Sequence, residues 1–357
     1  MYLRKCIPIL FWLLFASHPA SAQSVRVGVL GLFRPHEFSL AAFPGAAVIL
    51  RADQQNFVLE TSSGRGIAQV RVFEDAMLLE VGNQTVRASE VHATGRAGGA
   101  VDFVLAIPDK ICRRYRGTLE VKLSRGVLVP IVTMDLETAV ASTVQAESAP
   151  GTSIEALKAQ AVATRSYFVA AKGRHHDFDF CDTTHCQFLR EPPAPGTRSA
   201  LATRLTAGLV LAYRDRPFAA MFTRSCSGRT RTPAELGFSD HGYPYFPVNC
   251  DYCRTHPSHW RTQLSREHAA RLVQFGESGR LEIDRRLGWN AVPSNNFTVR
   301  GSGREVVLRG SGQGHGIGLC QQGARAMAAD GADFRQILDH YYPNATLISA
   351  RTFAPGF

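Results

Sequence analysis

Cysteine and histidine side chains gather in one short stretch near the middle of the chain. Cys181 and Cys186 stand five positions apart, and His175, His176 and His185 lie close to them in the sequence. Thiolate and imidazole groups are the usual ligands of tetrahedral zinc, so Cys181, Cys186 and His175 could hold a zinc ion. His176 is an alternative ligand. The spacing also permits a disulfide or a reactive cysteine with His185 as its base, although it favours a metal or a disulfide over a nucleophile.

A second cysteine pair, Cys250 and Cys253, has the C-x-x-C spacing of a zinc knuckle. Combined with Cys181 and Cys186, this pair would complete a four-sulfur zinc set. A local disulfide, or two longer ones to other cysteines, is also feasible. No strand precedes the motif and no helix is indicated after it, so a thioredoxin-like redox role is not favoured.

A single carboxyl group, that of Glu147, stands at the corner between two predicted helices. A carboxyl in such a corner can be partly shielded from water, which raises its pKa toward the range of a general acid. Residue type alone does not establish this role, because a glutamate in a loop is more commonly solvated.

Glycines surround His315 in the run from Gly314 to Gly318. The run lacks the Lys-Ser/Thr end of a phosphate loop, and no dinucleotide-binding spacing fits it. Glycines beside a histidine would let the backbone approach a bulky ligand while the imidazole hydrogen-bonds to it. A tight turn with a structural histidine explains the same residues equally well.

The elements that must position these residues are of two kinds. Between Val25 and Val132, short alternating runs of branched residues are broken by Gly, Pro and Asn, a pattern typical of strands. A hairpin is predicted over residues 209–222, and helical spacing predicts helices over residues 135–146, 152–172, 267–275, 320–329 and 333–340. We therefore expect an α+β fold, a β-rich scaffold with a few short helices that form a cleft. The expected division is a β-rich N-terminal region, residues 23–109, followed by a domain over residues 110–350.

The second predicted helix carries the clearest local signals. Thr152 and Glu155 have the spacing of a capping box, in which each side chain satisfies a free N–H at the helix start. The apolar residues of this helix fall on one face, and Lys158 and Arg165 fall on another. We therefore expect Arg165 on the polar face.

The N-terminal residues 1–22 have the pattern of a secretory signal peptide. Arg4 and Lys5 precede an apolar run, and Ala20-Ser21-Ala22 forms an A-x-A cleavage site. We expect export across the inner membrane to the periplasm or cell wall. No later stretch of about 18 apolar residues predicts a transmembrane anchor.

Charge and cysteine content narrow the class of partner. The 40 Lys and Arg residues exceed the 30 Asp and Glu residues, a net charge of +10, which favours an anionic partner. Export makes nucleic acid a poor candidate and leaves an anionic wall polymer. Once the signal peptide and its Cys6 are removed, seven of the eight cysteines remain. Because seven is odd, at least one is unpaired or bound to metal, and outside the cytoplasm the others could form disulfides.

Five motifs follow one another in the second half of the chain. They are EALKAQAVATRSY at 155–167, CDTTHCQ at 181–187, FTRSCSGRT at 222–230, GHGIGLCQQGA at 314–324 and HYYP at 340–343. In this order they resemble the stage II sporulation protein D (SpoIID/LytB) family of secreted peptidoglycan lytic transglycosylases. The resemblance covers about residues 110–350, with a poor match over residues 255–300.

The resemblance implies a catalytic role for Glu147. The family's acid lies eight positions before the glutamate of the first motif, which here is Glu147 within Val144-Gln-Ala-Glu147. Ser148-Ala149 stands where the family usually has Met-Pro. The implied reaction cleaves the MurNAc–GlcNAc bond and leaves a 1,6-anhydro end, with Glu147 as both acid and base and with no cofactor required for catalysis.

The resemblance also implies contacts with peptidoglycan glycan strands. It assigns substrate-binding roles to Gln160, Arg165, His185, Gln187, Ser225, Gly228, His315, Gln321 and Tyr341. Some family members hold zinc with the cysteines of the 181–187 loop, which favours a structural zinc here. Cys226 and Cys320 stand where serine is common in the family, and they could form a bridge if both motifs line one cleft.

Two other functions are compatible with the sequence. The first is a non-catalytic glycan-binding module that recruits or stimulates a wall amidase, because the residues after Glu147 depart from the family's pattern. The second is a Cys–His peptidase that uses Cys186 as its nucleophile.

Overall fold

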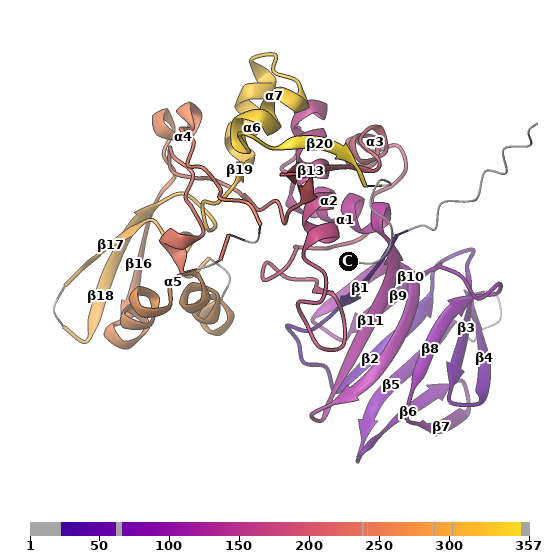
Figure 1. The fold of residues 1–357 in the computed structure, drawn as a ribbon. Helices are drawn as coiled ribbons and strands as arrows, with labels where there is room; N and C mark the ends of the chain where they lie inside the picture. The colour runs from indigo at the N-terminus through magenta and orange to yellow at the C-terminus, as the bar shows by residue number, and fades with distance from the viewer. Residues whose placement is uncertain are drawn as a thin grey trace, which may run out of the picture.

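The computed structural model describes residues 23–61, 66–237, 239–240, 242–288, 290–301 and 303–350. The predicted signal peptide lies outside these residues. A curled, half-barrel sheet, a central group of helices and a smaller lobe of strands and helix lie next to one another (Figure 1), so the predicted α+β fold is confirmed.

The large sheet has twelve strands. In spatial order its main path is β12-β1-β11-β10-β9-β2-β5-β6-β7, and β8, β3 and β4 branch from β10. The strands are β1 (Ser24–Gly28), β2 (Glu37–Ala42), β3 (Ala47–Ala52), β4 (Gln55–Glu60), β5 (Ile67–Phe73), β6 (Ala76–Val81), β7 (Gln84–Ala88), β8 (Val91–Gly95), β9 (Val101–Ile107), β10 (Ile111–Ser124), β11 (Val127–Asp135) and β12 (Phe180–Cys181).

Alternation along these strands builds the first hydrophobic core. In β9, every second residue is buried, including Phe103 and Leu105, because successive side chains of a strand point to opposite faces. The predicted strands between residues 25 and 132 are therefore confirmed. The expected boundary near residue 110 falls at the turn between β9 and β10, and β10 and β11 belong to the same sheet as the strands before it.

The helical group stands beside one end of this sheet. Its helices are α1 (Leu136–Glu147), α2 (Ile154–Ala170), α3 (Arg198–Leu205), α6 (Gln321–Ala329) and α7 (Phe334–Tyr341). Short strands accompany them: β13 (Leu209–Tyr213), β14 (Arg216–Pro217), β15 (Phe222–Thr223), β19 (Leu319–Cys320) and β20 (Thr346–Ser349). The predicted helices at 135–146, 320–329 and 333–340 are confirmed within one or two residues.

Helix α2 is buried on two sides and joins two cores. Leu157 and Phe168 pack into the core of the large sheet, whereas Ala159 and Val162 pack against β13, α6 and α7. A helix that is apolar almost all round belongs in the interior. Its N-cap is Ser153, whose side chain accepts a hydrogen bond from the backbone N–H of Ala156, so the predicted capping box with Thr152 is wrong by one residue.

Two further predictions are corrected. The expected hairpin is formed by β13 and β14 only, and Phe222 instead pairs in parallel with Leu319 of β19. The predicted helix 267–275 is part of the longer α5 (Arg266–Leu287), which continues past a break at Gly276, where φ is 52°. A side chain at Gly276 would come within 2.9 Å of the Leu236 carbonyl oxygen, so glycine is required there.

The smaller lobe contains α5 and three strands, β16 (His259–Ser265), β17 (Phe297–Arg300) and β18 (Glu305–Ser311). It has its own core, made of Leu264, Ala269, Leu272, Ile283, Val292, Val306 and Leu308. A 3-10 turn, η2 (Ala234–Leu236), and the short helix α4 (Asp251–Thr255) lie between β15 and this lobe in the sequence. The lobe coincides with most of the segment that matches the resemblance poorly.

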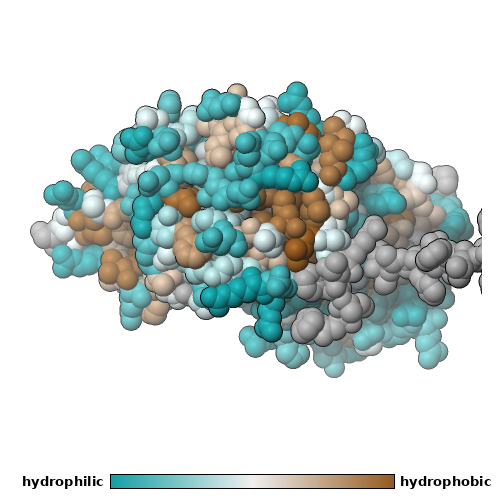
Figure 2. Space-filling model, turned by 45° about the horizontal axis from the view of Figure 1, so that its top comes forward, coloured by the Kyte–Doolittle hydropathy of each residue, from teal (hydrophilic) through white to brown (hydrophobic). Residues whose placement is uncertain are grey.

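The surface is largely hydrophilic on the face shown in Figure 2, where hydrophobic residues form separate patches. Exposed large hydrophobic side chains include Val273 and Phe275, both on α5. Within the described residues, none of the helices combines the length and the apolar character that a membrane crossing requires.

Candidate functional site

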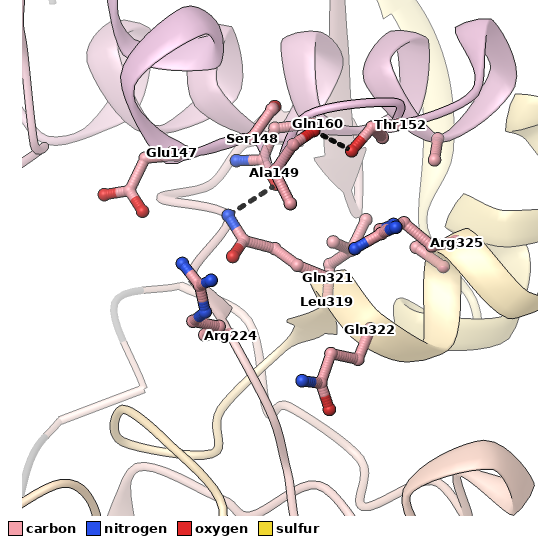
Figure 3. Close-up of a pocket in the computed structure, with 12 residues that line it drawn as sticks. Glu147, Ser148, Ala149, Thr152, Gln160, Arg224, Leu319, Gln321, Gln322 and Arg325 are labelled. Atoms are coloured by element: carbon pink, nitrogen blue, oxygen red, sulfur yellow. Dashed lines mark hydrogen bonds between the residues drawn. The ribbon is translucent and has the colours of Figure 1, made fainter.

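A pocket opens where the end of α1, the first half of α2, the residue after β15 and the start of α6 meet (Figure 3). Its empty space, including the part open to solvent, is about 440 Å³. The lining residues are Glu147, Ser148, Ala149, Thr152, Ala156, Gln160, Arg224, Leu319, Gln321, Gln322, Ala324 and Arg325. These residues include one carboxyl group and two guanidinium groups, so the lining carries a net positive charge that suits an anionic ligand.

Glu147 is the last residue of α1 and sits at the edge of this pocket. Helix α1 begins at the N-cap Asp135, whose side chain accepts the Thr138 N–H, and ends at Ser148, whose N–H bonds to the Val144 carbonyl. The negative end of the helix dipole therefore lies at Glu147, which disfavours its carboxylate.

Burial raises the pKa of Glu147 from its ordinary 4.5 to about 7. Three neighbours act in the opposite direction: a hydrogen bond from Gln321, the positive charge of Arg224 and a hydrogen bond from the Phe188 backbone N–H. Burial is the largest effect, and the resulting pKa is suited to a group that both donates and accepts a proton near neutral pH.

Gln321 connects the two sides of the pocket. Its Nε2 donates to the Oε1 of Gln160 on α2 at 3.4 Å, as the dashed line in Figure 3 marks. Gln160 is buried, and its own amide donates to Thr164 Oγ1 at 3.3 Å. Because both amides are held, the Gln321 side chain is oriented beside Glu147. Gln160 and Gln321 are the predicted binding residues that the structure places in the pocket with Glu147.

Arg165, predicted on a polar face, is fully buried and lies outside the pocket lining. Its guanidinium donates two hydrogen bonds to the Glu137 carboxylate, at 2.8 and 2.6 Å, and others to the carbonyls of Thr203 and Leu209. The expectation of a polar face is therefore wrong. Arg165 joins α1, α2, α3 and β13, and so holds the helix that carries Glu147.

Asp182 is the nearest other acid in the sequence motifs, but it has a structural partner. Its carboxylate accepts from Arg113 at 3.2 Å and from the Leu30 backbone N–H at 3.3 Å, and both charged side chains are buried. Burial raises the pKa of Asp182 to about 6, while Arg113 opposes the rise. Asp182 fixes its loop to the sheet, so Glu147 remains the single carboxyl of the pocket.

Four metal-ligating side chains meet in the loop after α2. We call His175, Cys181, His185 and Cys186 the loop cluster; their candidate ligand atoms all lie within 4.8 Å of one another. His175 Nε2 is 3.3 Å from Cys186 Sγ, and His185 Nδ1 is 3.5 Å from the same sulfur. The set Cys181, Cys186 and His175 is thus brought together, and His185, predicted to contact glycan, lies in it as the fourth member. The alternative ligand His176 points to solvent.

The remaining cysteines of the core form a separate group. We call Cys226, Cys250, Cys253 and Cys320 the buried four-cysteine cluster; their sulfur atoms lie within 4.8 Å of one another and all four residues are buried. The four-sulfur set that combined Cys181 and Cys186 with Cys250 and Cys253 is therefore wrong, because these pairs belong to different clusters. Cys226 and Cys320 do lie together, but as free thiols.

Both clusters have donor sets that zinc prefers. Two thiolates with two imidazoles, or four thiolates, are the usual ligands of structural tetrahedral zinc. Cys112, the other described cysteine, is exposed and belongs to neither cluster.

Two more predicted binding residues, Gln187 and His315, lie outside the pocket lining. Gln187 is buried, and its Oε1 has no hydrogen-bond partner. His315 Nδ1 accepts the Ile317 N–H at 3.0 Å, and its ring bonds to the Phe222 carbonyl. Burial lowers the pKa of His315, which favours a neutral ring held by the turn.

Ser225, Gly228 and Tyr341 also lie outside the pocket lining and border the buried four-cysteine cluster. Ser225 Oγ is 3.5 Å from Cys253 Sγ, and the Gly228 carbonyl accepts the Cys250 N–H. The Tyr341 hydroxyl donates to Cys250 Sγ at 3.5 Å. These three residues lie away from the pocket because they contact Cys250 or Cys253 of the buried four-cysteine cluster.

The sequence interpretation did not single out Arg224, Gln322, Arg325 or Phe188. Arg224 lies inside one of the five motifs, so its position was a usable signal. Arg325 is four residues after Gln321 on α6, and side chains at this spacing share a helix face. Nothing in the sequence indicates that the Phe188 N–H meets Glu147.

Part of the chain is similar to known proteins. Residues 124–213 match the family model described as stage II sporulation protein, SpoIID. An uncharacterised protein of Brachyspira hyodysenteriae is 28% identical over 267 residues, which cover 66% of this chain and 72% of that protein. The amidase enhancer of Bacillus subtilis is 38% identical over 68 residues, 19% of this chain and 10% of the enhancer. The family segment contains Glu147, α2 and the loop cluster, whereas the buried four-cysteine cluster lies beyond it.

Proposed function

Since the chain belongs to the SpoIID family of stage II sporulation proteins through residues 124–213, we propose that it is a lytic transglycosylase that cleaves the glycan strands of peptidoglycan. The observation that carries the proposal is the environment of Glu147. The carboxyl of Glu147 has a pKa near 7 and lines a positively charged pocket. It is the only acidic group among the described residues that line this pocket.

A single carboxyl separates this reaction from ordinary glycoside hydrolysis. Most hydrolases use two carboxyl groups, one as acid and one as base or nucleophile. Here Glu147 would first donate its proton to the glycosidic oxygen between MurNAc and GlcNAc. Its carboxylate would then take the proton of the MurNAc C6 hydroxyl, whose oxygen attacks C1. The C1–O4 bond breaks, the C1–O6 bond forms, and no water is consumed.

The neighbours of Glu147 fit both halves of this cycle. Burial favours the protonated acid before the bond breaks. The Gln321 amide, the Phe188 N–H and Arg224 stabilise the carboxylate that results, so the proton can be released and recovered near neutral pH. Arg224 and Arg325 would also attract the lactyl and peptide carboxylates of the substrate.

The loop cluster would hold a structural zinc ion with His175, Cys181, His185 and Cys186 as ligands. When bound, zinc supplies four coordination bonds that fix the loop and takes no part in the reaction. The loop ends at Phe188, whose N–H meets Glu147, so the metal would keep this donor in place. We further propose that the chain is exported and acts in the periplasm or cell wall.

The test is digestion of purified sacculi by the purified chain, with products separated and weighed by mass spectrometry. The expected products carry 1,6-anhydro ends and are one water lighter than hydrolysis products. The Glu147→Gln variant should release none, while Glu267→Gln, an exposed residue of α5, should release as much as the wild type. Products with reducing ends would contradict the mechanism. Parallel digestion of peptide-stripped sacculi would show whether stem peptides must first be removed.

A second candidate function is favoured by the 68-residue match to an amidase enhancer. In this case the chain would bind glycan strands and stimulate a wall amidase without cleaving glycan itself. Wild-type protein that sediments with sacculi, releases no glycan and accelerates a purified amidase would support this function over the first.

A further inference from the structure

The buried four-cysteine cluster takes no part in the proposed reaction, yet its arrangement is specific. Four side chains from three separate parts of the chain place their sulfur atoms within 4.8 Å of one another. Cys226 follows β15, Cys250 and Cys253 belong to the start of α4, and Cys320 ends β19. Free cysteine thiols are ordinary core residues, but four that converge from distant positions point to a shared ligand.

We propose that this cluster binds one zinc ion through four thiolates, in addition to the ion proposed for the loop cluster. In tetrahedral zinc sites the Zn–S distance is about 2.3 Å, which puts neighbouring sulfur atoms about 3.8 Å apart. Cys253 Sγ and Cys320 Sγ are 3.5 Å apart, close to that value. A disulfide would instead require about 2.05 Å.

Polar groups that can hydrogen-bond to the sulfur atoms surround the cluster. The Gly323 N–H points at Cys320 Sγ at 3.5 Å, and the Tyr341 hydroxyl donates to Cys250 Sγ at 3.5 Å. The Ser225 hydroxyl is also 3.5 Å from Cys253 Sγ. Outer hydrogen bonds of this kind orient metal ligands and stabilise their charge.

Close packing of α6 against the cluster depends on a glycine. A side chain at Gly323 would overlap both the Tyr341 hydroxyl and the Cys250 sulfur. Gly323 therefore lets the start of α6 approach near enough for Cys320 to join the other three cysteines.

The position of the cluster explains what the metal would do. Arg224 stands two residues before Cys226, and Gln321 follows Cys320 directly. Both side chains reach the pocket and act on Glu147. The zinc ion would thus fasten the wall of the pocket opposite α1, where the paired strands β15 and β19 have only two residues each.

Metal content of the purified, untagged full chain tests the proposal. Elemental analysis should give two zinc ions per chain. Cys253→Ser and Gly323→Ala should each lower the count to one, as should Cys181→Ser through the loop cluster. Cys112→Ser and Gly196→Ala, which change an exposed cysteine and a glycine with free space around it, should leave two. A zinc count unchanged by Cys253→Ser would overturn the proposal.

A measurement on the unaltered cysteines guards against variants that fail to fold. In the Cys181→Ser chain, cobalt(II) should bind once, with the strong thiolate-to-cobalt absorption of a four-sulfur tetrahedral site. Wild-type protein, denatured and alkylated without reductant, should carry an alkyl group on every cysteine. Failure of the four cluster cysteines to be alkylated would mean disulfides and overturn the proposal, as would iron in place of zinc. These results do not depend on glycan cleavage, so they fail or succeed separately from the proposed activity.

Discussion

The two walls of the pocket are built by different means. The wall that carries Glu147 consists of α1 and α2, which bury apolar side chains in two cores and are joined by the Arg165–Glu137 pair. The opposite wall, which carries Arg224 and Gln321, has two-residue strands, and the buried four-cysteine cluster stands directly behind it.

One wall therefore carries Glu147, the proposed reacting group, and the other carries the residues that shift its pKa. The first wall lies within the SpoIID segment and is held by packing of long regular elements. The second lies outside that segment and combines the two-residue strands β15 and β19 with the start of α6, and the proposed zinc ion would hold these parts together. Substitutions in the first wall should therefore abolish glycan cleavage or destabilise the whole fold. Substitutions in the second wall should lower the rate of cleavage moderately and shift its pH dependence.

The largest effect is expected on the first wall, from Glu147→Gln. The amide retains the size of the side chain but neither donates nor accepts the catalytic proton. Loss of a general acid and base typically lowers a rate by about 10²- to 10⁴-fold. The measurement is the initial rate of anhydro-product release from sacculi. An unchanged rate would move catalysis away from this residue and remove the functional difference between the walls.

Arg165→Met should give the next largest effect, on stability. It leaves Glu137 and the carbonyls of Thr203 and Leu209 without their buried donor. Breaking a buried pair by removing one partner typically costs about 3–5 kcal/mol, and the partial exposure of Glu137 points to the lower end. Urea unfolding measures the loss, and Arg51→Met on the exposed face of β3 should change the free energy of unfolding by less than about 0.5 kcal/mol. A similar loss in both variants would contradict the special position of Arg165.

Gln321→Ala, on the second wall, should lower the rate of anhydro-product release about tenfold. A tenfold change corresponds to about 1.4 kcal/mol, roughly the contribution of one hydrogen bond to a charged group. In the wild type, activity should fall as pH rises through about 7, because Glu147 must be protonated to act. Gln321 lowers the pKa of Glu147, so its removal should raise that pKa and move the alkaline fall to higher pH.

A matched control comes from the neighbouring Gln322→Ala, which removes a lining amide that does not act on Glu147. Its pH profile should coincide with that of the wild type. If both variants keep the wild-type profile, the second wall does not adjust the acid.

Local signals in the sequence predicted most of the fold. Helical spacing predicted α7, and alternation predicted strands such as β9, because each signal depends on residues close in the chain. The break at Gly276 hid the length of α5, since the residues on its two sides do not share one helical phase.

The candidate site was predicted less completely, for a physical reason. Glu147, Gln160 and Gln321 were found through the resemblance, and the structure brings all three to one pocket. The charge of Arg165 suggested that its side chain would face solvent. Its partner Glu137 is 28 residues away in the chain, so the sequence did not reveal the ion pair that allows Arg165 to be buried. Cysteine spacing indicated the loop cluster, whose ligands are close in the chain, but it cannot show which distant cysteines meet, so the buried four-cysteine cluster was not predicted.

The smallest expected effect is a pH-dependent difference in thermal stability that arises from Glu147. The pKa of Glu147 is about 7 in the folded chain and near 4.5 when unfolded, so the folded state binds this proton more tightly. The stability it contributes is complete below about pH 4.5 and is lost as pH rises through about 7. Glu147→Gln carries no charge at any pH. It should therefore match the wild type in Tm at about pH 4.5 and exceed it by about 2–4 °C at about pH 8. Thermal unfolding followed by circular dichroism at both pH values measures the difference, with Glu267→Gln as the control that should show none. An equal Tm at both pH values would mean that Glu147 is solvated like any surface acid, and the contrast between the two walls would lose its chemical basis.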